Sequence, residues 1–302
     1  SWLFYAEYNV KLVLFNLFRN SDYIYSVDAD TLLAGGIINT IKKNKLIYDA
    51  HEYFEYSPEI INKKLIQNIW NRITRFGVSR AKYCITVCKS LSKIMGKQFG
   101  KEFIVIRNTP TKSTLAFIPI ENRKKIIWYQ GVLNIGRGLE EMIQCMPQLP
   151  EYELHLAGDG DIANELKQLV QNLKLESQVK FLGKLSYNDL IEKNRSSWIG
   201  INFLSDTSPS YYYSLANKTF DYIQAGLPSI HMNFPEYEEI INTYPVGIVI
   251  KTLTSSEIIH AVKNYESEIK YSEAIDACNA AAKEFCWENE ATSLPWRDLL
   301  ET

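Results

Sequence analysis

The sequence lacks several features that would place it among membrane, secreted or metal proteins. No stretch of its 302 residues approaches the ~20 consecutive apolar residues of a membrane-spanning helix, and no signal peptide is visible. The five cysteines are an odd number and none shows the spacing of a metal site. Cys84 and Cys88, in the strand-like run YCITVC, are expected to be buried thiols. We therefore expect a cytoplasmic protein.

The chain also lacks an initial Met. It begins abruptly at SWLFYAEYNV, so we expect that an N-terminal piece is missing. A hydrophobic content of 46% with 23% charged residues is ordinary for globular proteins. The length favours two domains, each long enough to build its own core.

Acidic residues are nearly absent from one part of the chain. Residues 60–107 contain a single acid, Glu102. The same segment contains eleven basic residues: Lys63, Lys64, Arg72, Arg75, Arg80, Lys82, Lys89, Lys93, Lys97, Lys101 and Arg107. Such segregation, in a chain of net charge −2, favours an anionic partner for this part. A solvated, lysine-rich helix face is the alternative. Apolar residues interleave with these charges at helical spacing and are expected to face the core: Ile66, Ile69, Trp70, Ile73 and Phe76.

Strand-like apolar runs alternate with helix-length segments, which predicts parallel sheets with right-handed crossovers. The segment 109–124 breaks this rhythm and is interpreted as a linker. We expect two doubly wound α/β lobes facing a cleft, over residues 1–108 and 125–285. The last segment, 286–302, is expected to form a helix that packs back toward the N-terminal lobe.

A short acidic motif, DAD at residues 28–30, follows the strand-like run YIYSV. Paired carboxylates at a strand end can hold a divalent cation beneath a nucleotide diphosphate. Asp30 is followed directly by the helical run TLLAGGIINTI, however, so it can instead cap that helix. We favour the cap and predict no metal site.

The stretch SLANKTFDYIQAGLPSI, residues 214–230, predicts a helix, a glycine stop and a buried strand. Lys218 and Asp221 are three residues apart, so they share one helix face near the N-terminus. A helix N-terminus suits a diphosphate, a lysine there adds a positive charge, and a nearby carboxylate can accept hydrogen bonds from ribose hydroxyls. A salt bridge between residues i and i+3 on a solvated face is the alternative.

Five fragments in order resemble the GT-B glycosyltransferases of family 4, which are retaining enzymes. YQGVLNIGRGLEEMI, LHLAGDG, VKFLGKLS and SLANKTFDYIQAGLPSI are similar to the donor lobe, and LIYDAHEYFEYSPE resembles the acceptor-lobe segment that carries a histidine. The resemblance covers nearly the whole chain. The first elements of that fold, including a glycine-rich loop, would precede Ser1, so the N-terminal lobe looks truncated.

The resemblance implies roles for particular residues. Gly131 would let the backbone approach the diphosphate, and Arg137 and Lys218 would stabilise the leaving group, with Asp221 on the ribose. Backbone groups near Lys184 and Leu185 would face the nucleobase. Two departures are visible. The first member of the family's glutamate pair falls at Tyr213, which passes the sugar contact to amides around Ser214 and Leu215. The position where the family often has a second basic residue is occupied by Val132 here.

His51 follows the strand-like run KLIYDA, at the end where a cleft residue belongs. It lies between Asp49 and Glu52 in the segment that resembles the family. The resemblance implies that His51 contacts the donor sugar or the reacting centre. A purely structural histidine is the alternative.

Together these residues predict a metal-independent, retaining glycosyltransferase of hexosyltransferase type with a nucleotide-diphosphate sugar, UDP or GDP, as donor substrate and no cofactor. A glycan or lipid-linked acceptor in bacterial surface polysaccharide synthesis is expected, with no nucleic acid partner. The basic segment favours peripheral attachment to an anionic membrane surface at its inner face. Two alternatives are a sugar-nucleotide epimerase of similar fold and an inactive nucleotide-sugar-binding protein.

Overall fold

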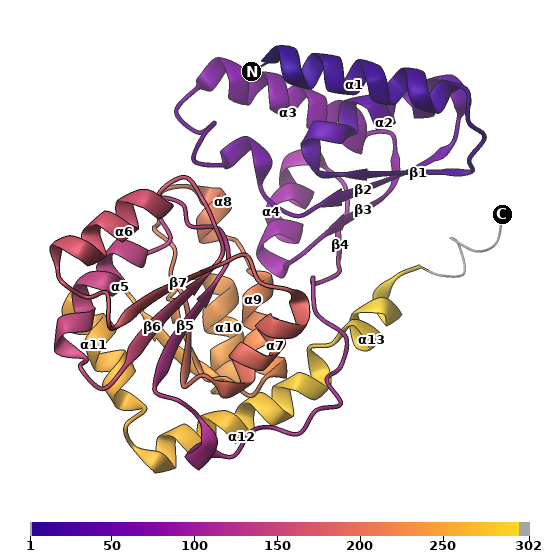
Figure 1. Ribbon diagram of the computed structural model, residues 1–302. Helices are drawn as coiled ribbons and strands as arrows, with labels where there is room; N and C mark the ends of the chain where they lie inside the picture. The colour runs from indigo at the N-terminus through magenta and orange to yellow at the C-terminus, as the bar shows by residue number, and fades with distance from the viewer. Residues whose placement is uncertain (1, 296–302) are drawn as a thin grey trace. The chain divides into compact units, whose positions relative to one another are not determined.

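The computed structural model describes residues 2 to 295 and divides them into two compact units (Figure 1). The first unit comprises the described residues up to Asn108, the segment Thr207–Ser214 and the described residues from Glu290 on. The second comprises Thr109–Asp206 and Leu215–Asn289. The chain therefore passes between the units four times.

The first unit contains a parallel sheet whose strands follow chain order. Its strands are β1 (Tyr23–Val27), β2 (Lys45–Ala50), β3 (Ala81–Thr86) and β4 (Ile104–Val105). Its helices are α1 (Trp2–Leu17), α2 (Asp28–Lys42), η1 (Phe54–Tyr56), α3 (Lys64–Val78), α4 (Lys89–Phe99), α8 (Pro209–Tyr212) and η4 (Ala291–Ser293). Strand β2 is buried along almost its whole length, which fits its apolar sequence KLIYDA.

The second unit contains a six-stranded parallel sheet of order β10-β9-β8-β5-β6-β7. Its strands are β5 (Ile126–Gln130), β6 (Glu153–Ala157), β7 (Val179–Gly183), β8 (Ile199–Asn202), β9 (Ser229–Met232) and β10 (Gly247–Ile250). The strand order reverses between β5 and β8, and such a reversal opens a crevice at the carboxyl ends of the strands.

Helices flank this second sheet (Figure 1). They are η2 (Ile120–Asn122), α5 (Leu139–Cys145), η3 (Met146–Gln148), α6 (Ala163–Asn172), α7 (Tyr187–Ser196), α9 (Asn217–Gln224), α10 (Pro235–Thr243), α11 (Ser255–Asn264) and α12 (Glu268–Glu284). One core cluster joins the fully buried Trp128 of β5 to Tyr222 of α9. This packing fixes α9 against the strand next to the crevice.

Three of the predicted boundaries differ from the structure. Residues 207–214 were expected in the second lobe, but they count with the first unit because Cys88 Sγ donates to the carbonyl of Tyr213 (3.2 Å) and α8 contacts η1. The expected linker 109–124 counts with the second unit, where Ser113 N donates to Gln224 Oε1 (3.0 Å).

The third difference concerns the predicted helix over 286–302. The structure has a short α13 (Trp287–Glu290) followed by η4, and residues 296–302 lie outside the described part. Trp287 N donates to the carbonyl of Pro110 (2.9 Å) in the second unit. Glu290, in the first unit, accepts from the backbone N–H (2.8 Å) and the guanidinium (3.0 Å) of Arg107.

The predicted core-facing stripe of α3 is partly wrong. Trp70 is buried, but Ile66 and Ile69 are 41% and 48% exposed. The buried face runs through Trp70, Thr74 and Gly77. Ile66 lies one turn before Trp70, and Ile69 lies to one side of this face. None of the helices in the described residues is long and apolar enough to cross a membrane.

Candidate functional site

A cavity of about 680 Å³ lies in the second unit at the reversal of strand order. The loops after β5, β6 and β7 and the first half of α9 supply its walls. Its lining residues are Gln130, Gly131, Val132, Ala157, Gly158, Asp159, Lys184, Leu185, Leu190, Asn217, Lys218 and Asp221. Because all of them belong to the second unit, this unit builds the cavity by itself.

Two glycines bring the loops after β5 and β6 into contact. Gly131 and Gly158 have φ angles of 142° and 139°, in the region that disfavours side chains. A Cβ on Gly158 would lie 1.8 Å from the carbonyl oxygen of Gly131. A Cβ on Gly131 would lie 3.1 Å from Lys218 Nζ. Gly158 therefore allows the two loops to touch, and Gly131 leaves room for a ligand to approach the backbone beside the lysine.

Lys218 is a buried cation that lines the cavity. Its side chain is 9% exposed, and Nζ lies 3.9 Å from the centroid of the Tyr129 ring. Burial, and then the charge of Arg137, hold the pKa of Lys218 well below its usual value. Within the described residues, no ion pair joins Lys218 to a carboxylate. An anion entering the cavity would supply the missing negative charge and favour the protonated amine.

Asp221 lines the same cavity one turn further along α9. Gln130 Nε2 donates to its Oδ2 at 2.7 Å. Burial raises the pKa of Asp221 to about 6, against the lowering effects of Gln130 and Lys218. At neutral pH the carboxylate is therefore mostly ionised and can accept hydrogen bonds from hydroxyl groups. Because both side chains are largely withdrawn from solvent, the alternative of a surface salt bridge is disfavoured.

The N-terminus of α9 has no capping side chain that would compete with an anion. Its N-cap, Ala216, provides no side-chain hydrogen bond to the first turn. Free N–H groups and the positive end of the helix dipole favour negative charge there. The N-terminus of α9 and Lys218 thus both favour a bound anion.

Other predicted donor-site residues fall in different places. Lys184 and Leu185 line the cavity directly after Gly183. Arg137 is half-buried and outside the lining, but close enough to depress the pKa of Lys218. Leu215 is buried and does not line the cavity. Ser214 counts with the first unit, where its Oγ donates to the carbonyl of Tyr211 (2.8 Å).

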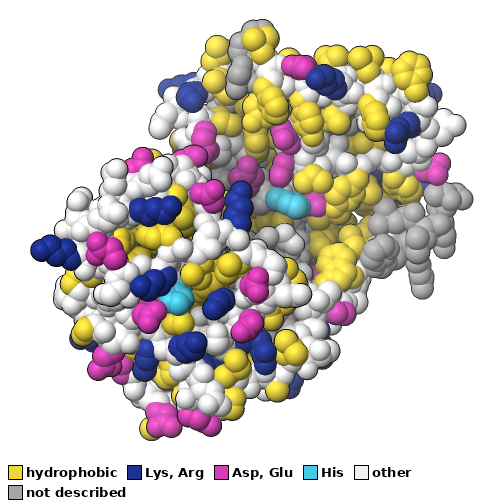
Figure 2. Space-filling view, viewed as in Figure 1, with side chains coloured by type: hydrophobic (Ala, Val, Ile, Leu, Met, Phe, Trp, Pro, Cys, Tyr) yellow, Lys and Arg dark blue, Asp and Glu magenta, His cyan; other side chains and the backbone are white. Residues whose placement is uncertain are grey.

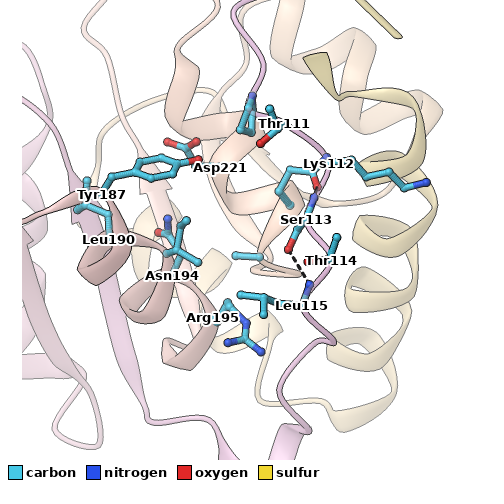
Figure 3. Close-up of a pocket in the computed structure, with 14 residues that line it drawn as sticks. Thr111, Lys112, Ser113, Thr114, Leu115, Tyr187, Leu190, Asn194, Arg195 and Asp221 are labelled. Atoms are coloured by element: carbon cyan, nitrogen blue, oxygen red, sulfur yellow. Dashed lines mark hydrogen bonds between the residues drawn. The ribbon is translucent and has the colours of Figure 1, made fainter. Parts of the chain in front are cut away.

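A smaller cavity of about 240 Å³ adjoins Asp221 and Leu190 (Figure 3). One face of α7 and the segment Pro110–Leu115 form its walls. In Figure 3 the ring of Tyr187 points toward the Asp221 carboxylate. Burial and the charge of Asp221 raise the pKa of Tyr187. Asp221 therefore stands in a wall shared by two cavities.

In the first unit, His51 lies just past the carboxyl end of β2. Its Nε2 is 3.1 Å from Asp49 Oδ2, and its backbone N–H donates to Asp28 Oδ1 at 2.8 Å. Tyr25 Oη donates to the same Asp49 oxygen at 2.5 Å. The hydrogen bond with Asp49 is the main cause that raises the pKa of His51. The imidazole is thus held by its neighbours while its side chain stays 42% exposed.

Carboxylates crowd around this histidine. Partial burial and the charge of Asp28, followed by that of Glu59, raise the pKa of Glu52 to about 7. Asp28 itself has φ 56°, which is unusual for a residue with a side chain. Burial raises the pKa of Asp28. The group can therefore exchange protons near neutral pH.

The predicted helix cap by Asp30 is wrong. Helix α2 begins at Asp28 with Val27 as its N-cap, and no side chain caps it. The helix thus starts two residues before the predicted cap, and Asp28, at its first position, has a left-handed φ and accepts from His51 N through Oδ1. Asp30 lies in the first turn instead. Among the described residues, no group of three His, Cys, Asp or Glu side chains has an arrangement that could hold a metal ion.

A family model for glycosyl transferases of group 1 matches residues 112–284, more than half of the chain. The chain belongs to this family. An uncharacterized glycosyltransferase of Methanocaldococcus jannaschii is 25% identical over 179 residues, which are 58% of this chain and 44% of the relative. The matched part thus spans less than half the length of this curated relative.

Solved structures share the fold of this group 1 glycosyl transferase. Sucrose-phosphate synthase from Thermosynechococcus elongatus superposes with a TM-score of 0.78 at 14% identity, over 98% of this chain and 78% of that one. Anabaena HepE in complex with UDP-glucose gives a TM-score of 0.75 at 18% identity, over 94% and 79%. The predicted GT-B fold class is therefore confirmed, while the roles of individual site residues stay predictions.

Sequence reasoning missed several residues that line the cavity of the second unit. Gln130, Gly158, Asp159 and Asn217 were given no role. Gly158 and Asp159 lie in the fragment LHLAGDG, at a strand end, which is a usable signal. Gln130 precedes Gly131 directly at the end of β5, but nothing in a strand-end glutamine indicates its partner on α9.

The hydrogen bond between Asp49 and His51 can be tested by titration. Asp49→Asn removes the negative charge that favours imidazolium, so the pKa of His51 should fall, as followed by NMR of the imidazole C–H signals. Asp22→Asn, an exposed change in the loop before β1, is the matched control. An unchanged His51 titration in Asp49→Asn would show that this contact does not control the imidazole.

Proposed function

We propose that this chain transfers a sugar from a nucleotide-diphosphate sugar to a hydroxyl acceptor, with retention at the anomeric carbon and without a metal ion. The observation that carries the proposal is the pairing of buried Lys218 and Asp221 on one face of α9, in a cavity at the reversal of strand order. Family membership supports the reaction class.

In the proposed complex, the diphosphate lies against Lys218, the start of α9 and the loop at Gly131. Asp221 accepts from the ribose, and the loop at Lys184 and Leu185 faces the base. The complexes of HepE with UDP and UDP-glucose make a UDP sugar the first donor class to test. The shapes of the loops support this arrangement, because Gly131 leaves the backbone accessible beside Lys218 and Gly158 lets the loop after β6 pack against it.

The proposed chemistry breaks the bond between the anomeric carbon and the diphosphate oxygen. A new bond forms from the acceptor oxygen to the same face of that carbon, and the acceptor proton passes to the leaving diphosphate. Lys218, Arg137 and the N-terminus of α9 stabilise the charge that develops on the leaving group. His51 is proposed to contact the donor sugar or the reacting centre, and its support is an exposed imidazole held by Asp49.

The second candidate is a protein that binds nucleotide sugars without transferring them. Val132 favours it, because it lines the cavity where a second basic residue is expected and offers no charge to the leaving group. Sugar transfer to any acceptor distinguishes the two.

Truncating the ribose-binding carboxylate tests the donor site. Asp221→Ala should weaken UDP binding by roughly 1–3 kcal/mol, the scale of a hydrogen bond to a charged group. Isothermal titration calorimetry measures the change. The control is Glu176→Ala, an exposed carboxylate of the same unit outside the cavity lining. Equal affinities in Asp221→Ala and the wild type would reject the ribose assignment.

Metal independence has its own test. Because cations of the protein are proposed to stabilise the leaving diphosphate, activity should be unchanged by EDTA at millimolar concentration. Release of UDP from a UDP sugar, with and without added Mn²⁺, is the measurement. Loss of activity in EDTA with recovery on Mn²⁺ would overturn this part of the proposal and return attention to Asp28 and Asp30.

The proposed acceptor is a glycan or lipid-linked molecule at the cytoplasmic face of an anionic membrane, as in bacterial surface polysaccharide synthesis. Helix α3 supports this with exposed apolar residues beside basic ones: Leu65 is 75% exposed, and Lys63, Lys64 and Arg72 are exposed around it. Helix α1 is joined to α3 by the ring contact of Tyr5 with Trp70 (5.1 Å between centroids).

Helix α1 extends the apolar part of this surface. Figure 2 shows hydrophobic side chains gathered over the first unit where α1 lies. The exposed ones on and just after α1 are Leu3, Phe4, Val10, Leu14, Phe15 and Phe18. Apolar residues with flanking cations are the composition that binds an anionic lipid surface.

Matched charge reversals test the membrane surface. Each basic residue near an anionic bilayer contributes about 1 kcal/mol, so Lys63→Glu with Lys64→Glu should reduce binding to anionic liposomes by about tenfold or more. The control reverses two exposed lysines of the second unit that lie outside the basic segment, Lys263 of α11 and Lys270 of α12. Sedimentation with liposomes measures binding. A wild type that does not prefer anionic over neutral liposomes at low salt would reject membrane attachment.

A further inference from the structure

The ribose-binding carboxylate proposed above comes from Asp221, where the resemblance places the second member of the family's glutamate pair, so this side chain is one methylene shorter. We infer that Gln130 is a positioning residue that compensates for this by holding the Asp221 carboxylate toward the donor cavity. This inference rests on the proposed function, because it assigns a second residue to the ribose part of the same site.

Gln130 has a fixed orientation between two partners. It is the last residue of β5 and 8% exposed. Its Oε1 accepts from Trp128 Nε1 at 3.2 Å, and its Nε2 donates to Asp221 Oδ2 at 2.7 Å. An indole N–H can only donate, so the amide oxygen must face Trp128 and the amide nitrogen must face Asp221. The fully buried Trp128 thereby anchors the amide.

The hydrogen bond links the two elements that build the crevice. Gln130 lies on the strand at the reversal of order, and Asp221 lies on the helix that presents Lys218. Gln130 engages only Oδ2, and no other hydrogen bond of the described residues reaches the Asp221 carboxylate. Oδ1 is therefore available to a ribose hydroxyl while the carboxylate cannot rotate freely.

The same contact keeps the carboxylate ionised. Burial raises the pKa of Asp221 to about 6, while the Gln130 amide and the Lys218 charge lower it. The other titratable or charged groups around Asp221 or lining its two cavities are Tyr187 and Arg195 on α7, Tyr222 on α9, Asp159 after β6, Lys184 after β7 and Lys112. Without the amide the pKa of Asp221 rises further. A protonated carboxyl accepts hydrogen bonds less well, so binding that needs the carboxylate is lost as the pH falls through this pKa.

The test replaces Gln130 with a side chain of similar length that cannot donate. Gln130→Met should weaken UDP binding at neutral pH by about tenfold, the scale of one hydrogen bond to a charged group. It should leave binding of 2′,3′-dideoxy-UDP unchanged, because that probe lacks both ribose hydroxyls. The loss of UDP affinity on acidification should begin at higher pH in the variant. Titration of the UDP phosphate is common to all variants and cancels in the comparison.

Two further variants keep the test decisive. Gln178→Met removes a glutamine that donates to the carbonyls of Met146, Leu149 and Tyr152 in the same unit, so it controls for loss of buried hydrogen bonds as such. If Gln130→Met does not fold, as judged by thermal unfolding, Trp128→Phe removes the anchor of the amide instead. Trp128→Phe should also weaken UDP binding, and its loss of UDP affinity on acidification should also begin at higher pH than in the wild type.

The outcomes separate this inference from the proposed function. A wild type that binds UDP and dideoxy-UDP equally, or an Asp221→Ala variant with full UDP affinity, would overturn the ribose assignment and the inference with it. A wild type that prefers UDP, with the preference and its pH dependence retained in Gln130→Met, would overturn the inference alone. Reduced preference in Gln130→Met but not in Gln178→Met supports it.

Discussion

A buried lysine amine that no ion pair of the described residues joins to a carboxylate is the constraint on which the cavity of the second unit depends. A charge removed from water is costly, so burial holds the pKa of Lys218, beside the ring of Tyr129, well below its usual value. An anion bound in the cavity would offset this cost. The surrounding features follow from this requirement: glycines that leave space beside Nζ, a helix that starts without a capping side chain, and a second cation, Arg137, within electrostatic reach.

The two units carry different electrostatic environments at the ends of their strands. In the second unit, two lysines, Lys184 and Lys218, and two aspartates, Asp159 and Asp221, line the cavity, and the charge of Arg137 reaches Lys218. In the first unit, Asp28, Asp49 and Glu52 crowd around one imidazole. The hydrogen bond with Asp49 raises the pKa of His51, and burial followed by the charge of Asp28 raises the pKa of Glu52. The environment in the second unit suits a polyphosphate leaving group. The environment in the first unit suits hydroxyl groups whose protons must be held or moved near neutral pH.

The sequence predicted what depends on local pattern. Alternating strands and helices gave the parallel α/β class, and Lys218 with Asp221 at spacing three gave a shared helix face that the structure places in the cavity. Features decided by tertiary packing escaped prediction. Ile66 and Ile69 follow the helical period of α3 yet are exposed, because the buried residues of this helix begin at Trp70. Asp30 resembled a cap because no local signal shows that Asp28 turns to accept from His51. Gln130 meets Asp221 across 91 residues of sequence.

Neither unit is a continuous piece of chain, and this bears on how such proteins can be recombined. The family match over residues 112–284 includes Thr207–Ser214, an excursion whose contacts, such as that of Tyr213 with Cys88, belong to the first unit. A chimera that exchanges the donor half of one glycosyl transferase for another at the segment after Asn108 would carry a foreign eight-residue insert into the half it kept. The chimera would then gain the new donor specificity together with poor packing of the foreign α8 against η1 of the recipient. An exchange of the donor half should therefore retain the recipient's own sequence over residues 207–214.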